Sequence, residues 1–105
     1  MDTSLNGKTA LITGASKGLG LAMAKAFYSH GAQVVLLARG AADLATAEAE
    51  IQALMVPEEH RQTADVAAFV CDVTDAKAIA ATHQQALDRF GSIDILVNNA
   101  GQSAA

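Results

Sequence analysis

Short apolar runs alternate with longer segments of helical periodicity along this chain. Four runs, at residues 8–13, 33–38, 67–71 and 93–97, have the length and apolar character of buried strands. In the segments between them, apolar residues recur at intervals of three and four, which predicts three helices. The polar residues 56–65 are expected to form a surface loop. The apolar helix faces comprise Leu19, Ala22, Met23, Ala26 and Phe27; Leu44, Ala47, Ile51 and Leu54; and Ile79, Ala80, Ala86, Leu87 and Phe90.

Strands that are apolar on both faces and separated by amphipathic helices predict an α/β fold with a parallel sheet and right-handed crossovers. We expect a doubly wound sheet of four strands in the order 3-2-1-4. In such a sheet, ligands bind at the carboxyl ends of the strands, where the winding reverses between strands 1 and 4. With 105 residues, the chain is expected to form a single domain, residues 1–105.

A glycine-rich segment, Thr13-Gly14-Ala15-Ser16-Lys17-Gly18-Leu19-Gly20, joins the first predicted strand to the first helix. At such a junction the unpaired N–H groups of the first helical turn, together with the helix dipole, favour a bound phosphate. Gly14 permits a tight turn, Gly18 permits the close approach of a pyrophosphate, and Gly20 permits close packing of the helix. The spacing Gly-x-x-x-Gly-x-Gly differs from the common dinucleotide motif, so a tight turn without a ligand remains an alternative.

Two further motifs follow the third and fourth predicted strands. Asp72-Val73 comes after the third strand, and Asn98-Asn99-Ala100-Gly101 comes after the fourth. With the glycine-rich segment, in this order and each at a strand end, they resemble the cofactor-binding half of the short-chain dehydrogenase/reductase family. The resemblance extends over about residues 6–101 and implies a partial Rossmann-like fold that binds a nicotinamide dinucleotide.

By this resemblance, Asp72 accepts a hydrogen bond from the adenine amino group and the Val73 backbone contacts the adenine ring. Residues 98–101 line the adenine ribose and brace the central strands. The alternatives are an acid at the start of a helix for Asp72 and a simple turn for residues 98–101. The cofactor-binding residues that the resemblance implies are Thr13, Gly14, Ser16, Lys17, Gly18, Leu19, Gly20, Arg39, Asp72, Val73, Asn98, Ala100 and Gly101.

The end of the second strand predicts which dinucleotide is bound. NAD-binding proteins of this fold usually carry an acid there, which accepts hydrogen bonds from the ribose hydroxyls. This strand ends in Arg39, residues 21–41 contain no acid, and the nearest acid, Asp43, is expected to be poorly directed toward the ribose. A guanidinium suits a 2′-phosphate, and Lys17 is expected to flank it, which matches the NADP-preferring pattern of the family. We therefore expect NADP rather than NAD, with a solvated arginine and lysine as the alternative.

In the family, a serine and a Tyr-x-x-x-Lys pair beyond the Asn-Asn-Ala-Gly segment carry out the chemistry. This chain ends four residues after Gly101, and its only tyrosine, Tyr28, is followed at the fourth position by Ala32. We therefore predict that the chain contains no catalytic residue. We expect it to be the front half of an NADP(H)-dependent oxidoreductase, truncated after strand 4. A non-catalytic dinucleotide-binding or regulatory module and a truncated product without stable function remain alternatives. Because nothing follows to pair with strand 4, self-association or a missing carboxyl-terminal half is expected.

Composition and charge narrow the class of partner. Residues 1–42 carry four basic side chains and one acid, whereas residues 43–105 carry three basic and ten acidic ones, for a net charge of −4. Because only 4% of residues are aromatic, a phosphate-bearing small ligand suits the basic part better than a nucleic acid. No spacing of His, Cys, Asp and Glu predicts a metal site. No membrane span or signal peptide is predicted, and the single Cys71 fits a reducing compartment, so we expect a cytoplasmic protein.

Overall fold

Strands and helices alternate along residues 4–99, the part of the chain that the computed structural model describes. In chain order the elements are β1 (Thr9–Thr13), α1 (Gly18–Ser29), β2 (Gln33–Ala38), α2 (Ala41–Gln52), α3 (Glu58–Arg61), β3 (Asp65–Val70), α4 (Ala76–Phe90) and β4 (Ile95–Val97). The bounds of β2 are those that the apolar run predicts, and β1 differs by one residue.

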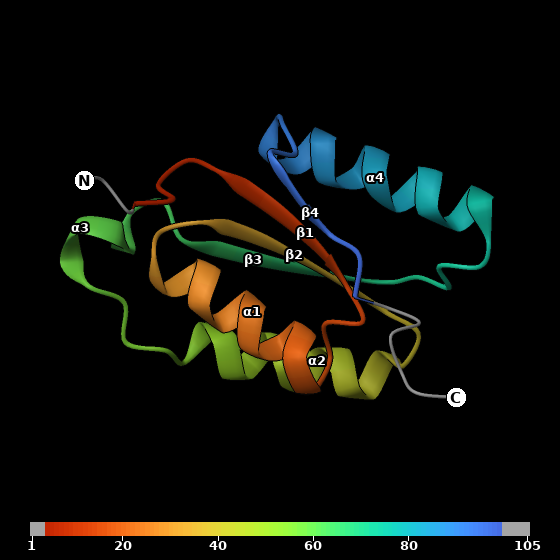
Figure 1. Ribbon diagram of the computed structural model, residues 1–105, viewed down its shortest axis with the longest axis horizontal. Helices are drawn as coiled ribbons and strands as arrows, with labels where there is room; N and C mark the ends of the chain where they lie inside the picture. Colours follow the sequence, from red (N-terminus) through yellow and green to blue (C-terminus); the bar gives the residue numbers. More distant parts are fainter. Residues whose placement is uncertain (1–3, 100–105) are drawn as a thin grey trace.

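The four strands form one parallel sheet in the order β3-β2-β1-β4, which confirms the predicted order. At its centre, Leu11 of β1 lies between Val35 of β2 and Leu96 of β4. Figure 1 shows α1 and α2 on one face of the sheet and α4 on the other, so the sheet is doubly wound. The carboxyl ends of all four strands therefore lie at one end of the sheet, where ligands bind in this class of fold.

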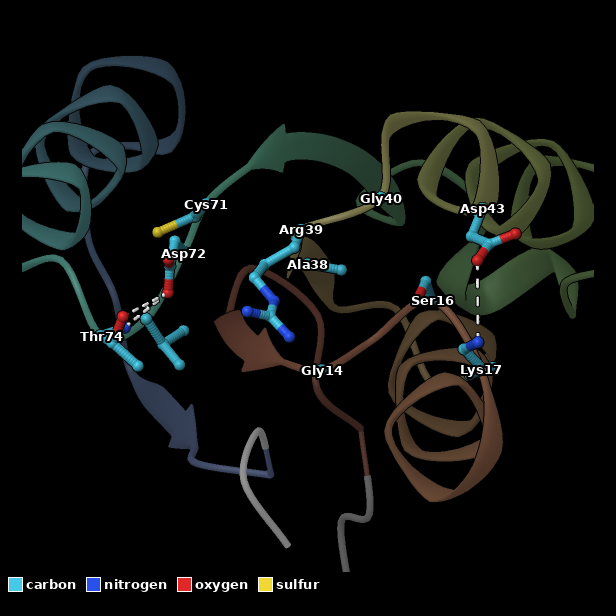
Figure 2. Close-up of a pocket in the computed structure, with 11 residues that line it drawn as sticks. Gly14, Ser16, Lys17, Ala38, Arg39, Gly40, Asp43, Cys71, Asp72 and Thr74 are labelled. Carbon is cyan, nitrogen blue, oxygen red and sulfur yellow. Dashed lines mark hydrogen bonds and ion pairs between the residues drawn. The ribbon is translucent and has the colours of Figure 1, made fainter. Parts of the chain in front are cut away.

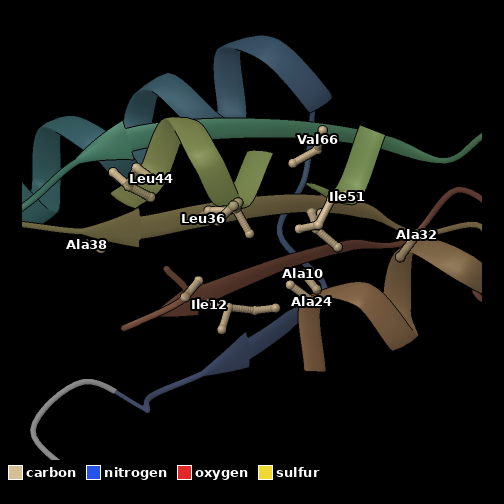
Figure 3. Close-up of a cluster of buried hydrophobic side chains, with 12 residues drawn as sticks. Ala10, Ile12, Ala24, Ala32, Leu36, Ala38, Leu44, Ile51 and Val66 are labelled. Carbon is tan, nitrogen blue, oxygen red and sulfur yellow. The ribbon is translucent and has the colours of Figure 1, made fainter. Parts of the chain in front are cut away.

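The larger hydrophobic core lies between the sheet and the helices α1 and α2 (Figure 3). It contains buried side chains from both central strands and both helices, among them Ile12, Ala24, Leu36, Leu44 and Ile51. A smaller cluster lies on the opposite side of the sheet and contains Leu11, Val35, Leu37, Cys71 and Ala86. Removing these apolar side chains from water on both faces is the main driving force for folding.

Helix α1 buries only part of the face that its periodicity predicts: Phe27 packs against the larger core and Met23 is half-buried. The buried residues of the helix are Gly20 and Ala24. Leu19, Ala22 and Ala26, which belong to the predicted apolar face, are exposed. The helix approaches the sheet so closely that a Cβ on Gly20 would overlap the backbone of the preceding loop. The fully buried residues of α1 are therefore small, and the larger Leu21, Phe27 and Tyr28 pack against the core beside them. The apolar stripe predicts the helix and only part of its buried face.

The structure contains one more helix in residues 4–99 than the three that the sequence predicts. Helix α3 lies within the polar segment 56–65, which was expected to be a loop. None of its residues is buried, so it has no apolar face that periodicity could reveal. Among the four helices of the described part, none is long and apolar enough to cross a membrane.

Two strand boundaries also differ from the prediction. Strand β3 runs from Asp65 to Val70 rather than over residues 67–71, and β4 begins at Ile95 rather than at residue 93. Asp94 accounts for the later start of β4, because its carboxylate accepts a hydrogen bond from the backbone N–H of Thr9 at 2.9 Å. A side chain thus satisfies a backbone donor that strand pairing would otherwise have used.

Candidate cofactor-binding site

An open pocket of about 470 Å³ lies at the carboxyl ends of β1, β2 and β3 (Figure 2). Its volume is in the range of small-molecule sites. Residues from the loops that follow these three strands meet in it, although the loops are well separated in the sequence. Six of the residues predicted to bind the cofactor line this pocket: Gly14, Ser16, Lys17, Arg39, Asp72 and Val73.

The glycine loop forms one wall of the pocket and leads into the first turn of α1. Lys17 is the N-cap residue of α1, and its side chain makes no capping hydrogen bond. Gly18 has a φ of +61°, and a Cβ on it would meet nothing within 4 Å. Leu19, the next residue, is 67% exposed. The first turn therefore combines uncapped N–H groups with open space beside Gly18, and this combination fits a pyrophosphate.

Asn99 holds the glycine loop beside β4. Its Nδ2 donates to the carbonyl oxygen of Gly14 at 3.2 Å, and its backbone N–H donates to Thr13 Oγ1 at 2.9 Å. A Cβ on Gly20 would come within 2.7 Å of Asn99 Nδ2, so a side chain at position 20 would disturb this contact. Among the described residues of the segment 98–101, Asn99 is thus the one that braces the loop.

Thr13 and Asn98 line a second hollow, of about 490 Å³, rather than the first. Thr13 Oγ1 donates toward Asn98 Oδ1 at 3.3 Å, which joins the carboxyl ends of β1 and β4. Val73 borders both hollows. The predicted residues that line a hollow are therefore divided between two neighbouring ones, whereas Gly18, Leu19 and Gly20 line neither. The predicted residues Ala100 and Gly101 lie outside the described residues.

Arg39 and Asp72 place opposite charges in the pocket. Figure 2 shows the Arg39 guanidinium pointing into the pocket, between Gly14 and Asp72. The Asp72 carboxylate accepts hydrogen bonds from the hydroxyl and the backbone N–H of Thr74, at 2.7 and 2.9 Å. These two bonds, and then the positive charge of Arg39, hold the pKa of Asp72 below its ordinary value. The carboxylate is therefore ionised at neutral pH and can accept a further hydrogen bond.

Asp43, which the sequence analysis expected to be poorly directed toward the ribose, also lines the pocket. Helix α2 begins at Ala41, so Asp43 stands in its first turn. From there its Oδ2 lies 3.7 Å from Lys17 Nζ, in an ion pair between the glycine loop and α2 (Figure 2). The sequence does carry a signal for this position, because the helix dipole favours an acid in the first turn of a helix. That signal indicates a helix terminus and gives no indication of the pocket.

A family model described as short chain dehydrogenase matches residues 8–105. The chain belongs to this family. The 15-hydroxyprostaglandin dehydrogenase of Mus musculus, whose name specifies NAD(+), is 39% identical over 97 residues, covering 92% of this chain and 34% of that protein. The chain spans about a third of the length of the curated relatives that it matches.

Solved structures of short-chain dehydrogenases superpose on most of the chain. A metagenomic short-chain oxidoreductase in complex with NADP has a TM-score of 0.79 and 39% identity, covering 94% of this chain and 41% of that one. An NAD+-bound xylitol dehydrogenase has a TM-score of 0.75 and 33% identity, covering 88% of this chain and 32% of that one. NADP and NAD+ both occur among these similar structures. The preference of this chain for one dinucleotide therefore has to be inferred from the residues of its own pocket.

The only tyrosine of this short-chain dehydrogenase family member, Tyr28, lies in α1 and packs against the larger core. Burial, and then the negative charge of Asp65, raise the pKa of its phenol. A tyrosine that acts as a general base needs a pKa that is shifted toward neutrality, so the surroundings of Tyr28 do not suit that role. Within residues 4–99, no three side chains of His, Cys, Asp or Glu are grouped so that they could hold a metal ion.

Proposed function

We propose that this chain is the dinucleotide-binding part of an NADP(H)-dependent short-chain oxidoreductase. The bound dinucleotide would supply the hydride chemistry, between its nicotinamide and a carbonyl or alcohol carbon. The first turn of α1, with Gly18, would hold the pyrophosphate. Asp72 would accept a hydrogen bond from the adenine amino group, and Asn98 would lie at the adenine ribose with Ala100 and Gly101.

The position of Arg39 is the observation that carries the choice of NADP. Its guanidinium points into the pocket from the end of β2, and among residues 4–99 it takes part in no ion pair. Ser16 and Lys17 line the same pocket. A guanidinium without a carboxylate partner suits a 2′-phosphate, to which it can donate two charge-assisted hydrogen bonds.

Calorimetry with NADP and NAD on the wild type and on an Ala38→Asp, Arg39→Leu double variant tests this preference. Charge-assisted bonds contribute about 1.5 to 3 kcal/mol, so the variant should bind NADP roughly 10- to 100-fold more weakly. NAD affinity should fall little, because the introduced carboxylate can accept the ribose hydroxyls. Equal affinities of the wild type for the two dinucleotides, or a variant that still prefers NADP, would refute the assignment.

A dinucleotide-binding or regulatory module that performs no catalysis is the second candidate. It is favoured by one observation: the 105 residues contain no Tyr-x-x-x-Lys sequence, and Tyr28 stands in an unsuitable environment. We expect the purified, sequence-verified chain to bind the dinucleotide without reducing carbonyl compounds. Robust turnover that is abolished by Gly18→Val would contradict this expectation. An in-frame or frameshifted Ser and Tyr-x-x-x-Lys in the DNA after codon 105 would favour the oxidoreductase.

We also propose that β4 is a site of association, either with a second copy or with a carboxyl-terminal half of the enzyme. Leu96 is 68% exposed, and the backbone of β4 pairs with β1 on one side only within the described residues. An apolar edge strand is a template for further strand pairing. Sedimentation at increasing concentration should show self-association of the isolated chain, whereas a monodisperse monomer with protected β4 amides would argue against it.

A further inference from the structure

Lys17 and Asp43 face each other at one rim of the pocket, between the glycine loop and the first turn of α2 (Figure 2). Lys17 Nζ lies 3.7 Å from Asp43 Oδ2. The other carboxylate of the pocket, Asp72, accepts two hydrogen bonds from Thr74 and is thereby held within its own turn. Asp43 therefore differs from Asp72, because its carboxylate is paired with one of the two cations of the pocket.

A 2′-phosphate that enters this pocket has to compete with Asp43 for the Lys17 ammonium. It also comes close to a carboxylate of the same sign, which opposes its binding. The competition is moderate, because the Lys17 and Asp43 side chains are 81% and 63% exposed and both water and salt screen them. NAD carries a hydroxyl in place of this phosphate, so its binding avoids both effects.

We propose that Asp43 is a specificity-determining residue that lowers the affinity of the pocket for the 2′-phosphate and so narrows its preference for NADP over NAD. This inference rests on the proposed function, since it requires that the adenosine part of a dinucleotide occupies the pocket. Arg39 supplies the preference for the phosphate, and Asp43 limits it by neutralising Lys17.

An Asp43→Asn variant tests the proposal, because it removes the charge and retains the shape of the side chain. NADP affinity should rise about two- to fivefold, and the gain should shrink as the ionic strength increases from about 0.05 to about 0.5 M. NAD affinity should remain unchanged. Asp43→Glu, which keeps the charge, should retain the wild-type ratio of the two affinities.

An ion pair between α1 and α2 provides the matched control. Lys25 Nζ of α1 lies 3.0 Å from Glu50 Oε2 of α2, and neither residue lines the pocket. Glu50→Gln changes the net charge by the same amount as Asp43→Asn. An equal gain in NADP affinity in the Glu50→Gln variant would mean that the effect comes from overall charge, and it would overturn the proposal.

The outcomes separate this inference from the function on which it rests. Wild-type protein that binds NADP, together with an Asp43→Asn variant whose ratio of affinities is unchanged or lower, would overturn the role of Asp43 and leave the proposed function standing. Absence of binding to either dinucleotide, in the wild type and in every variant, would overturn both.

Discussion

At the amino ends of the strands, polar side chains bond to neighbouring elements, whereas at the carboxyl ends several of them face a pocket. Asn6 is the centre of the amino-end network. Its Nδ2 donates to the carbonyl oxygen of Glu59 at 2.9 Å, and its Oδ1 lies 2.9 Å from His60 Nδ1 and 3.1 Å from Thr63 Oγ1. This network fastens α3 to the segment before β1, at the end of the sheet opposite the pocket (Figure 1).

At the carboxyl end, Thr13 and Asn99 also bond between elements, but the charged side chains that line the pocket do not follow this pattern. Arg39 takes part in no ion pair within residues 4–99, and the Lys17–Asp43 pair is long and exposed. Within the same residues, the Asp72 carboxylate accepts hydrogen bonds only from Thr74, in its own turn. Polar groups that are not committed to the fold can bind a ligand without breaking structural bonds. We therefore expect substitutions at the amino end to affect stability alone, and substitutions at the pocket to affect binding as well.

Two glycines offer the sharpest test of this contrast. Gly18 at the carboxyl end has a φ of +61° and Gly91, after α4 at the amino end, has a φ of +86°; a Cβ on either would meet nothing within 4 Å. An alanine at either position should therefore cost a similar amount of stability, about 1 to 2 kcal/mol, for the left-handed conformation. Only Gly18→Ala should also weaken NADP binding, by about tenfold or more, because its methyl group occupies the space proposed for the pyrophosphate.

Urea unfolding and calorimetry on both glycine variants measure the two effects separately. Gly91→Ala serves as the control for backbone strain. A similar loss of NADP affinity in both variants would mean that the carboxyl end is not the binding end.

Thr63 gives a smaller effect at the amino end. Thr63 lies between α3 and β3, and its hydroxyl donates to the carbonyl oxygen of Gly31, in the junction between α1 and β2, at 2.8 Å. Thr63→Val removes that donor and should lower the free energy of unfolding by about 1 kcal/mol, with NADP affinity unchanged. Thr46→Val on the exposed surface of α2 is the control and should change stability by less than about 0.5 kcal/mol. A Thr63 variant that retains its stability but binds NADP more weakly would contradict the expectation that the amino end affects stability and not binding.

The sequence predicts the sheet well because its strands are buried on both faces. Strand β2 is apolar over its whole length, and the predicted and observed bounds agree. The order of the strands follows from the alternation of strands and helices, since right-handed crossovers leave few topologies. Helix α3 escapes prediction because it is four residues long and has no buried side chain, so periodicity carries no information about it.

The candidate site is harder to predict in detail. The glycine loop, Arg39 and Asp72 follow from strand ends and motif order, and the structure brings them to one pocket. The place of Asp43 in the pocket cannot be predicted in the same way. It depends on where α2 starts and on which neighbouring loop the first turn of α2 meets. Part of the buried face of α1, namely Gly20 and Ala24, is missed for a related reason: the close approach at Gly20 favours small residues over the larger apolar ones that periodicity counts.

Two aspartates provide the smallest contrast between the ends. The Thr9 N–H and then the Ser92 hydroxyl hold the pKa of Asp94 below its ordinary value of 3.8. At the carboxyl end, the Thr74 hydroxyl and N–H do the same for Asp72. A pKa lowered in the folded state stabilises the protein above about pH 4, and this stabilisation is lost as the pH falls through the lowered pKa.

Replacing either aspartate by asparagine should therefore reduce stability at neutral pH and flatten its decline below about pH 4, because the titrating group is gone. Only Asp72→Asn should also weaken NADP binding at neutral pH, since the amide is a poorer acceptor than a carboxylate for the adenine amino group. Urea unfolding midpoints between about pH 3 and pH 7, combined with calorimetry, check both statements. If Asp94→Asn weakened NADP binding as much as Asp72→Asn, the loss of affinity would follow from the loss of stability. The two carboxylates would then not differ in their effect on NADP binding.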